Sequence, residues 1–203
     1  MRHHELVYLS LSNAASLLEN LYERRELLIK KARDLIKKSK EVIVNVYLEK
    51  WEDAERKISE LNIVKAELEN MAKTAGELYY SSTVRDSLAE YVEAIIYFRI
   101  LKDNSFPELN ELEVPPIPYI MGVLDVAGEL RRSILKFLRE ERLDDAERLL
   151  KFIESIYEAL SPHILPDSLV PGFRRKLDIV RQLFERSLSD ILYVSRPGKG
   201  ASN

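Results

Sequence analysis

Two short segments of this sequence place carboxylates one helical turn apart. In the first, Asp86, Glu90 and Glu93 are separated by four and three residues, and in the second Asp125 precedes Glu129 by four. At about 100° per residue, each set lies on one side of a helix. Acids opposite an apolar face are most often a solvated surface, but like charges at these spacings repel by roughly a few tenths of a kcal/mol. Acids gathered without intervening bases therefore indicate a cation or a polycation as partner.

The residue types narrow the chemistry that such a cluster could perform. The chain has no cysteine and only three histidines, two of them at positions 3 and 4. Thiol catalysis, disulfides and cysteine-ligated metals are excluded, and histidine-based zinc chemistry nearly so. Glycine-rich phosphate loops and nucleophile elbows are missing. Oxygen ligands alone select a hard cation, Mg²⁺ or Mn²⁺. The spacing leaves open whether the two acidic segments face each other.

Helices must position both segments, because apolar residues recur at helical spacing along almost the whole chain. We predict an all-α fold, an elongated bundle of about six to seven long helices. The predicted helices cover residues 12–50, 51–79, 82–101, 119–141, 143–160 and 173–194. The segment 104–118 contains four prolines and no periodicity, so we predict an unstructured connection there.

The length of 203 residues is typical of a single domain, which we place at residues 1–195. The tail at 196–203 is rich in glycine and polar residues and is predicted to be disordered. No window has the roughly 18 uncharged apolar residues of a membrane span, and the first residues do not resemble a secretory signal. We therefore expect a cytoplasmic protein with no membrane partner.

The net charge of −3 argues against binding of nucleic acid by bulk attraction, but the charges are unevenly distributed. Residues 24–40 contain eight bases and two acids, whereas the next 30 residues are mainly acidic. Blocks of this kind are usually solvated faces or partners in salt bridges between helices. The second interpretation is that the basic block at residues 24–40 forms a surface that binds a polyanion.

Two strings resemble a known family. They are Glu90-Tyr-Val-Glu-Ala and Tyr119-Ile-Met-Gly-Val-Leu-Asp-Val-Ala-Gly-Glu-Leu-Arg-Arg. Both are similar to motifs of the translin family, in particular of its translin-associated factor X branch and its archaeal homologues. The similarity extends over most of the chain and includes a C-terminal pattern at residues 176–183.

The resemblance implies a seven-helix protomer that assembles into a hollow shell, here a homo-octamer. It also implies an RNA-binding, Mg²⁺- or Mn²⁺-dependent endoribonuclease. The motifs place the catalytic and metal-binding carboxylates at Glu90, Glu93, Asp125 and Glu129. The partner would be RNA, with single-stranded DNA as a further ligand of the family.

Three bases are candidates for contacting nucleic acid. Arg85 is the one base in a stretch that is more basic in translin, Arg132 matches the family's Gly-Glu-Leu-x-Arg pattern, and Lys136 continues the same helical column. Arg132 could hold a phosphate oxygen or pair with Glu129. Two other functions stay open: a non-catalytic translin-like protein that binds single-stranded RNA or DNA, and a structural helical adaptor whose acids are ordinary solvent faces.

Overall fold

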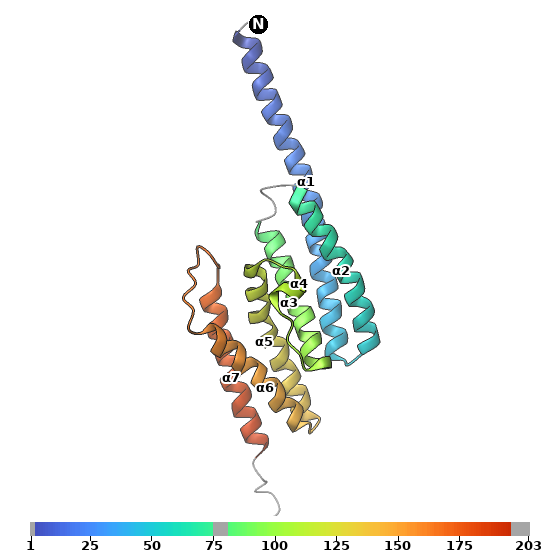
Figure 1. The fold of residues 1–203 in the computed structure, drawn as a ribbon, viewed down its shortest axis with the longest axis vertical. Helices are drawn as coiled ribbons and strands as arrows, with labels where there is room; N and C mark the ends of the chain where they lie inside the picture. Colours follow the sequence, from blue (N-terminus) through green and yellow to red (C-terminus); the bar gives the residue numbers. More distant parts are fainter. Residues whose placement is uncertain (1–2, 75–80, 196–203) are drawn as a thin grey trace, which may run out of the picture.

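The computed structural model describes residues 3–74 and 81–195 of the chain (Figure 1). The described residues form helices and connections but no strand, which confirms the all-α prediction. The helices are α1 (His3–Tyr47), α2 (Trp51–Thr74), α3 (Ser82–Asp103), α4 (Leu109–Leu112), α5 (Pro116–Arg139), α6 (Leu143–Leu160) and α7 (Phe173–Val194). The predicted disorder at 196–203 and the predicted end of the second helix at 75–79 lie outside the described residues.

Most predicted helix bounds agree with the structure, and the exceptions have local causes. Helices α6 and α7 match residue for residue, whereas α1 begins nine residues earlier than predicted. The prediction of an unstructured connection over 104–118 is wrong in part, because the segment contains α4 and the start of α5. Pro116 stands at the first position of α5, where the fixed φ of proline suits a helix and its missing N–H needs no partner.

Helices α3 and α5 pack against each other at the centre of the bundle (Figure 1). The α1–α2 hairpin lies against α3, and α6 and α7 lie against α5. Helix α3 is therefore buried on most sides, including Tyr97, which is fully buried and shares a 2.6 Å hydrogen bond with the Ser133 hydroxyl of α5. The side of α3 that carries Glu93 and Tyr97 faces α5 and not open solvent.

Gly122 allows the close approach of α5 to α3. A Cβ atom at this position would lie 2.5 Å from the carbonyl oxygen of Ala89 and 2.7 Å from the Val92 side chain. No side chain fits at those distances without a shift of the backbone of α3. This close contact lies one turn before Asp125 and helps to bring the two acidic segments together.

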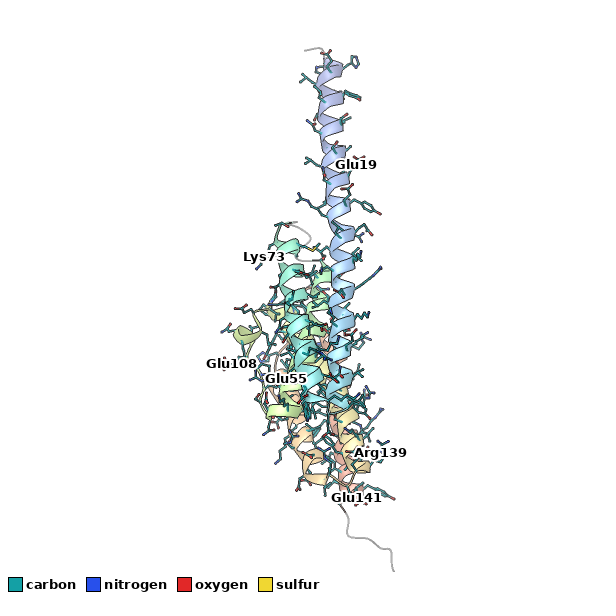
Figure 2. The ribbon with its side chains drawn as sticks, turned by 90° about the vertical axis from the view of Figure 1, so that its right-hand side faces the viewer. Glu19, Glu55, Lys73, Glu108, Arg139 and Glu141 are labelled. Atoms are coloured by element: carbon teal, nitrogen blue, oxygen red, sulfur yellow. The ribbon has the colours of Figure 1, made fainter. Side chains whose placement is uncertain are left out.

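The first part of α1, which we call the arm (residues 3–23), extends beyond the rest of the bundle, up to Arg24, which donates to the carbonyl of Thr74 at the end of α2 (Figures 1 and 2). In Figure 2, Glu19 on the arm lies well past Lys73 near the end of α2. Steps of seven residues back from Leu35 and Leu28 lead to Leu21, Ala14 and Val7 of the arm. The large apolar side chains of the arm are exposed, including Leu6, Leu9, Leu11, Leu17, Leu18 and Tyr22. Within the described residues, no helix combines the length and apolar character needed to cross a membrane.

Candidate functional site

The two acidic segments meet at the contact between α3 and α5. Glu93 of α3 is largely buried, and this burial, together with the charges of Asp125, Glu90 and Glu129, raises its pKa to about 8. Each of the other three carboxylates is thus close enough to Glu93 to oppose its ionisation. The two acidic segments therefore face each other. The structure brings the four carboxylates predicted from the sequence into one cluster, which we call the carboxylate cluster.

Glu90 lies at the edge of this cluster nearer to α1. Burial raises its pKa, and the neighbouring carboxylates of Asp125 and Asp86 act in the same direction. The ammonium groups of Lys40 and Lys176 oppose the increase. Two cations from distant parts of the chain therefore approach the carboxylate cluster, one from α1 and the other from α7.

Asp125 has a direct partner on α7. The Lys176 ammonium donates to both carboxylate oxygens, with Nζ 2.6 Å from Oδ1 and 2.5 Å from Oδ2. Both side chains are partly buried, with exposed fractions of 35% for Asp125 and 23% for Lys176. This ion pair is the closest cation contact of the carboxylate cluster, and it joins residues 51 positions apart.

Glu129 is the carboxylate with an unsatisfied oxygen. Its Oε2 atom is buried without a hydrogen bond, although Arg132 Nη1 lies 3.5 Å away. The Arg132 guanidinium stacks over the Tyr47 ring, 4.0 Å from its centroid, and half of its side chain is exposed. Arg132 therefore approaches Glu129 and still keeps donors free toward solvent.

The four carboxylates have the right chemistry for a hard divalent cation, but their side chains are not arranged to hold one. Four carboxylates without nitrogen or sulfur ligands are typical of Mg²⁺ and Mn²⁺ sites, and the buried Oε2 of Glu129 accepts no hydrogen bond and is available as a ligand. In the described part of the chain, however, no three acidic or histidine side chains are grouped closely enough to hold a metal ion. A metal would need a rearrangement of these side chains, including Asp125, whose two oxygens face Lys176.

The structure does not bring the other two predicted nucleic-acid contacts to the carboxylate cluster. Arg85 lies at the start of α3, 3.6 Å from Asp86. Lys136 donates to the Tyr47 carbonyl at 2.8 Å and to the Glu49 carboxylate at 2.5 Å. Lys136 thus connects α5 to the end of α1, and the ion pair with Glu49 gives it a structural role.

Sequence reasoning did not single out Lys40 or Lys176. Lys40 ends an exposed column on α1 with Arg33 and Lys37, spaced by four and three residues. None of the three forms a salt bridge with any residue that the structure describes. We call them the basic column. Helical spacing within the basic block at 24–40 could have identified it, but no local signal relates Lys176 to Asp125.

The fold and the site define an all-helical protein with a carboxylate cluster at its centre and a basic column beside it. The sequence profile of the Translin family matches residues 23–187, which include the cluster, the column and Lys176. The chain therefore belongs to the translin family. An uncharacterized protein of Methanocaldococcus jannaschii is 30% identical over 169 residues, covering 83% of this chain and 75% of that protein.

Solved structures show the same fold. The chain is similar to AfC3PO in its complex with duplex RNA, with a TM-score of 0.84, 32% sequence identity, and coverage of 91% of this chain and 96% of that one. Apo-NeC3PO gives a TM-score of 0.82 at 26% identity, over 91% of this chain and 97% of the other.

Proposed function

We propose that this protein binds RNA and cleaves its phosphodiester bonds as a Mg²⁺- or Mn²⁺-dependent endoribonuclease, within a shell of identical chains. The observation that carries the proposal is the carboxylate cluster itself. Glu90 and Glu93 from α3 approach Asp125 and Glu129 from α5, and their mutual repulsion is only partly offset by lysines. Such clustering costs stability, which is a recurrent property of catalytic sites.

Oxygen atoms of the four carboxylates would hold the cation, which when bound supplies an activated water and charge stabilisation at a phosphate. The side chains around them suit a phosphate ester. Arg132 has exposed guanidinium donors beside Glu129, and such donors bind phosphate oxygens with charge-assisted hydrogen bonds. The tight packing of α3 on α5 fixes the backbone on which all four carboxylates stand.

RNA binding is supported by the basic column and by the similarity to a protein solved with duplex RNA. Arg33, Lys37 and Lys40 are exposed along one face of α1, and the charge of Lys40 acts on Glu90. A polyanion that follows this column would thus approach the carboxylate cluster. Each neutralised phosphate contributes about −0.7 to −0.9 to the slope of log affinity against log salt, so three contacts predict a slope of roughly −2 or steeper.

The activity is tested with the isosteric variants Asp125→Asn and Glu93→Gln on a fluorescent RNA in Mg²⁺. We expect each variant to reduce cleavage by about 100-fold or more, because a metal ion contributes several kcal/mol to charge stabilisation. Glu158→Gln on the exposed face of α6 is the matched control and should cleave like the unaltered protein. Full activity of both cluster variants, with an intact helical circular dichroism spectrum, would exclude these carboxylates from catalysis.

The same preparation distinguishes the two other functions. A non-catalytic binding protein would bind labelled RNA equally with and without EDTA and leave it uncut. A structural adaptor would show no salt-dependent binding of RNA. The proposed nuclease instead requires both a salt-dependent affinity and cleavage that EDTA abolishes.

A further inference from the structure

The Lys176 ammonium lies beside the carboxylate cluster, where its positive charge offsets the repulsion between the acids. Lys176 lies in the first turns of α7, and its ammonium contacts both oxygens of Asp125. Its positive charge also favours ionisation of Glu90 and of Glu93. One side chain from α7 therefore interacts with three of the four carboxylates contributed by α3 and α5.

A divalent cation that bound Asp125 would compete with this ammonium for the same two oxygens. Both are cations, they would repel each other at a separation of a few ångströms, and both Asp125 oxygens already accept from Lys176. The described residues contain no group of three side chains close enough to hold a metal ion, so metal binding requires the carboxylates to rearrange. Binding of a metal by both oxygens of Asp125 then requires the ammonium to move.

We propose that Lys176 is a positioning residue that holds Asp125 while no divalent cation is bound, and that its displaced ammonium then contacts a phosphate of the RNA. The inference rests on the proposed function, since it takes the carboxylate cluster as the metal site. The long, flexible lysine side chain allows such an exchange of partners without movement of α7. Metal binding would thereby convert an internal ion pair into an additional contact for the substrate.

The first experiment measures Mn²⁺ affinity of the full chain by isothermal titration calorimetry. We expect Lys176→Met to bind Mn²⁺ about tenfold more tightly than the unaltered protein, because no competing ammonium has to leave; this equals about 1.4 kcal/mol. Lys176→Gln serves as a second neutral variant in case the methionine variant folds poorly. Lys151→Met, on the exposed face of α6, is the control and should leave Mn²⁺ affinity unchanged.

The second experiment measures binding of a non-cleavable 2′-O-methyl RNA in saturating Mn²⁺. Here Lys176→Met should weaken binding by about fivefold or more, with a smaller salt dependence. Lys176→Arg should restore most of the RNA affinity, because it keeps the positive charge. If Lys176 had only a structural role, its substitution would weaken binding of both Mn²⁺ and RNA or of neither. The proposal instead requires tighter binding of Mn²⁺ and weaker binding of RNA.

The outcomes separate the inference from the proposed function. Equal Mn²⁺ affinity of the unaltered protein and both neutral variants would overturn the role of Lys176 and leave the metal site intact. Unchanged RNA affinity of Lys176→Met in Mn²⁺ would overturn the phosphate contact. If neither the unaltered protein nor the neutral variants bind Mn²⁺ at millimolar concentration, the metal site itself is refuted, and the proposed nuclease function with it.

Discussion

Glu93 shows how the candidate site reduces the stability of the fold. It is largely buried beside three other carboxylates, and its pKa of about 8 lies well above the ordinary value of 4.5. Between these two pH values the folded protein holds a proton that the unfolded chain has released. The free energy of unfolding should therefore decrease as the pH rises through this range.

Glu93→Gln removes this pH dependence, because an amide cannot ionise. In EDTA we expect the variant to raise the melting temperature by about 3 °C or more at pH 9, since 1 kcal/mol corresponds to about 2–4 °C at this size. At pH 5, where Glu93 is mostly protonated in the folded state, the gain should be smaller. Thermal denaturation followed by circular dichroism measures both, and an equal gain at the two pH values would contradict a raised pKa of Glu93.

At the scale of elements, the α3–α5 contact determines where the carboxylates lie. Gly122 is the point of closest approach, because an added Cβ would meet the Ala89 carbonyl oxygen and the Val92 side chain. Gly128 lies on the same helix, where an added Cβ would meet nothing within 4 Å. The two glycines form a matched pair that separates packing from helix propensity.

Gly122→Ala should destabilise the protein, and Gly128→Ala should stabilise it. Overpacking costs about 1–3 kcal/mol, whereas Ala in a helix interior is favoured over Gly by about 1 kcal/mol. We therefore expect the melting temperature to fall by several degrees in the first variant and to rise by about 2–4 °C in the second. A rise of the melting temperature in both variants would show that the close approach of α5 to α3 does not limit stability.

At the scale of the whole molecule, the fold of a single chain does not explain the exposed apolar side chains of the arm. Leu11 and Leu18 are among these large exposed side chains. Large contiguous apolar surfaces on a soluble chain mark interaction sites. A second copy of the chain is the partner that fits the proposed shell, and fully burying a leucine contributes about 1.5–3 kcal/mol.

The double variant Leu11→Glu/Leu18→Glu should break this self-association. Both leucines are 66% exposed, so the helical content and the fold of the protomer should be preserved. Light scattering after size-exclusion chromatography should show a large assembly for the unaltered protein and a smaller species for the variant. Asn13→Glu/Asn20→Glu places the same charges on the arm at the same spacing, outside this pair of leucines, and should keep the large assembly. A monomeric unaltered protein would refute the shell.

The sequence by itself determined the helices and the sides of the helices on which the acids lie. Apolar periodicity is a local property, so α6 and α7 could be predicted to the residue, and Glu90 could be placed one turn before Glu93. The prolines predicted the start of α5 less well, because proline is compatible with the first turn of a helix as well as with a loop.

Only the tertiary structure decided which of those sides meet. Helical spacing fixes an angle around one axis but says nothing about the rotation of a neighbouring helix, so the approach of Glu93 to Asp125 came from the packing of α3 on α5. The partner of Asp125 depended on α7, which contributes Lys176 from 51 positions along the chain. Contacts between residues so distant in sequence are set by the packing of the whole bundle and leave no local pattern.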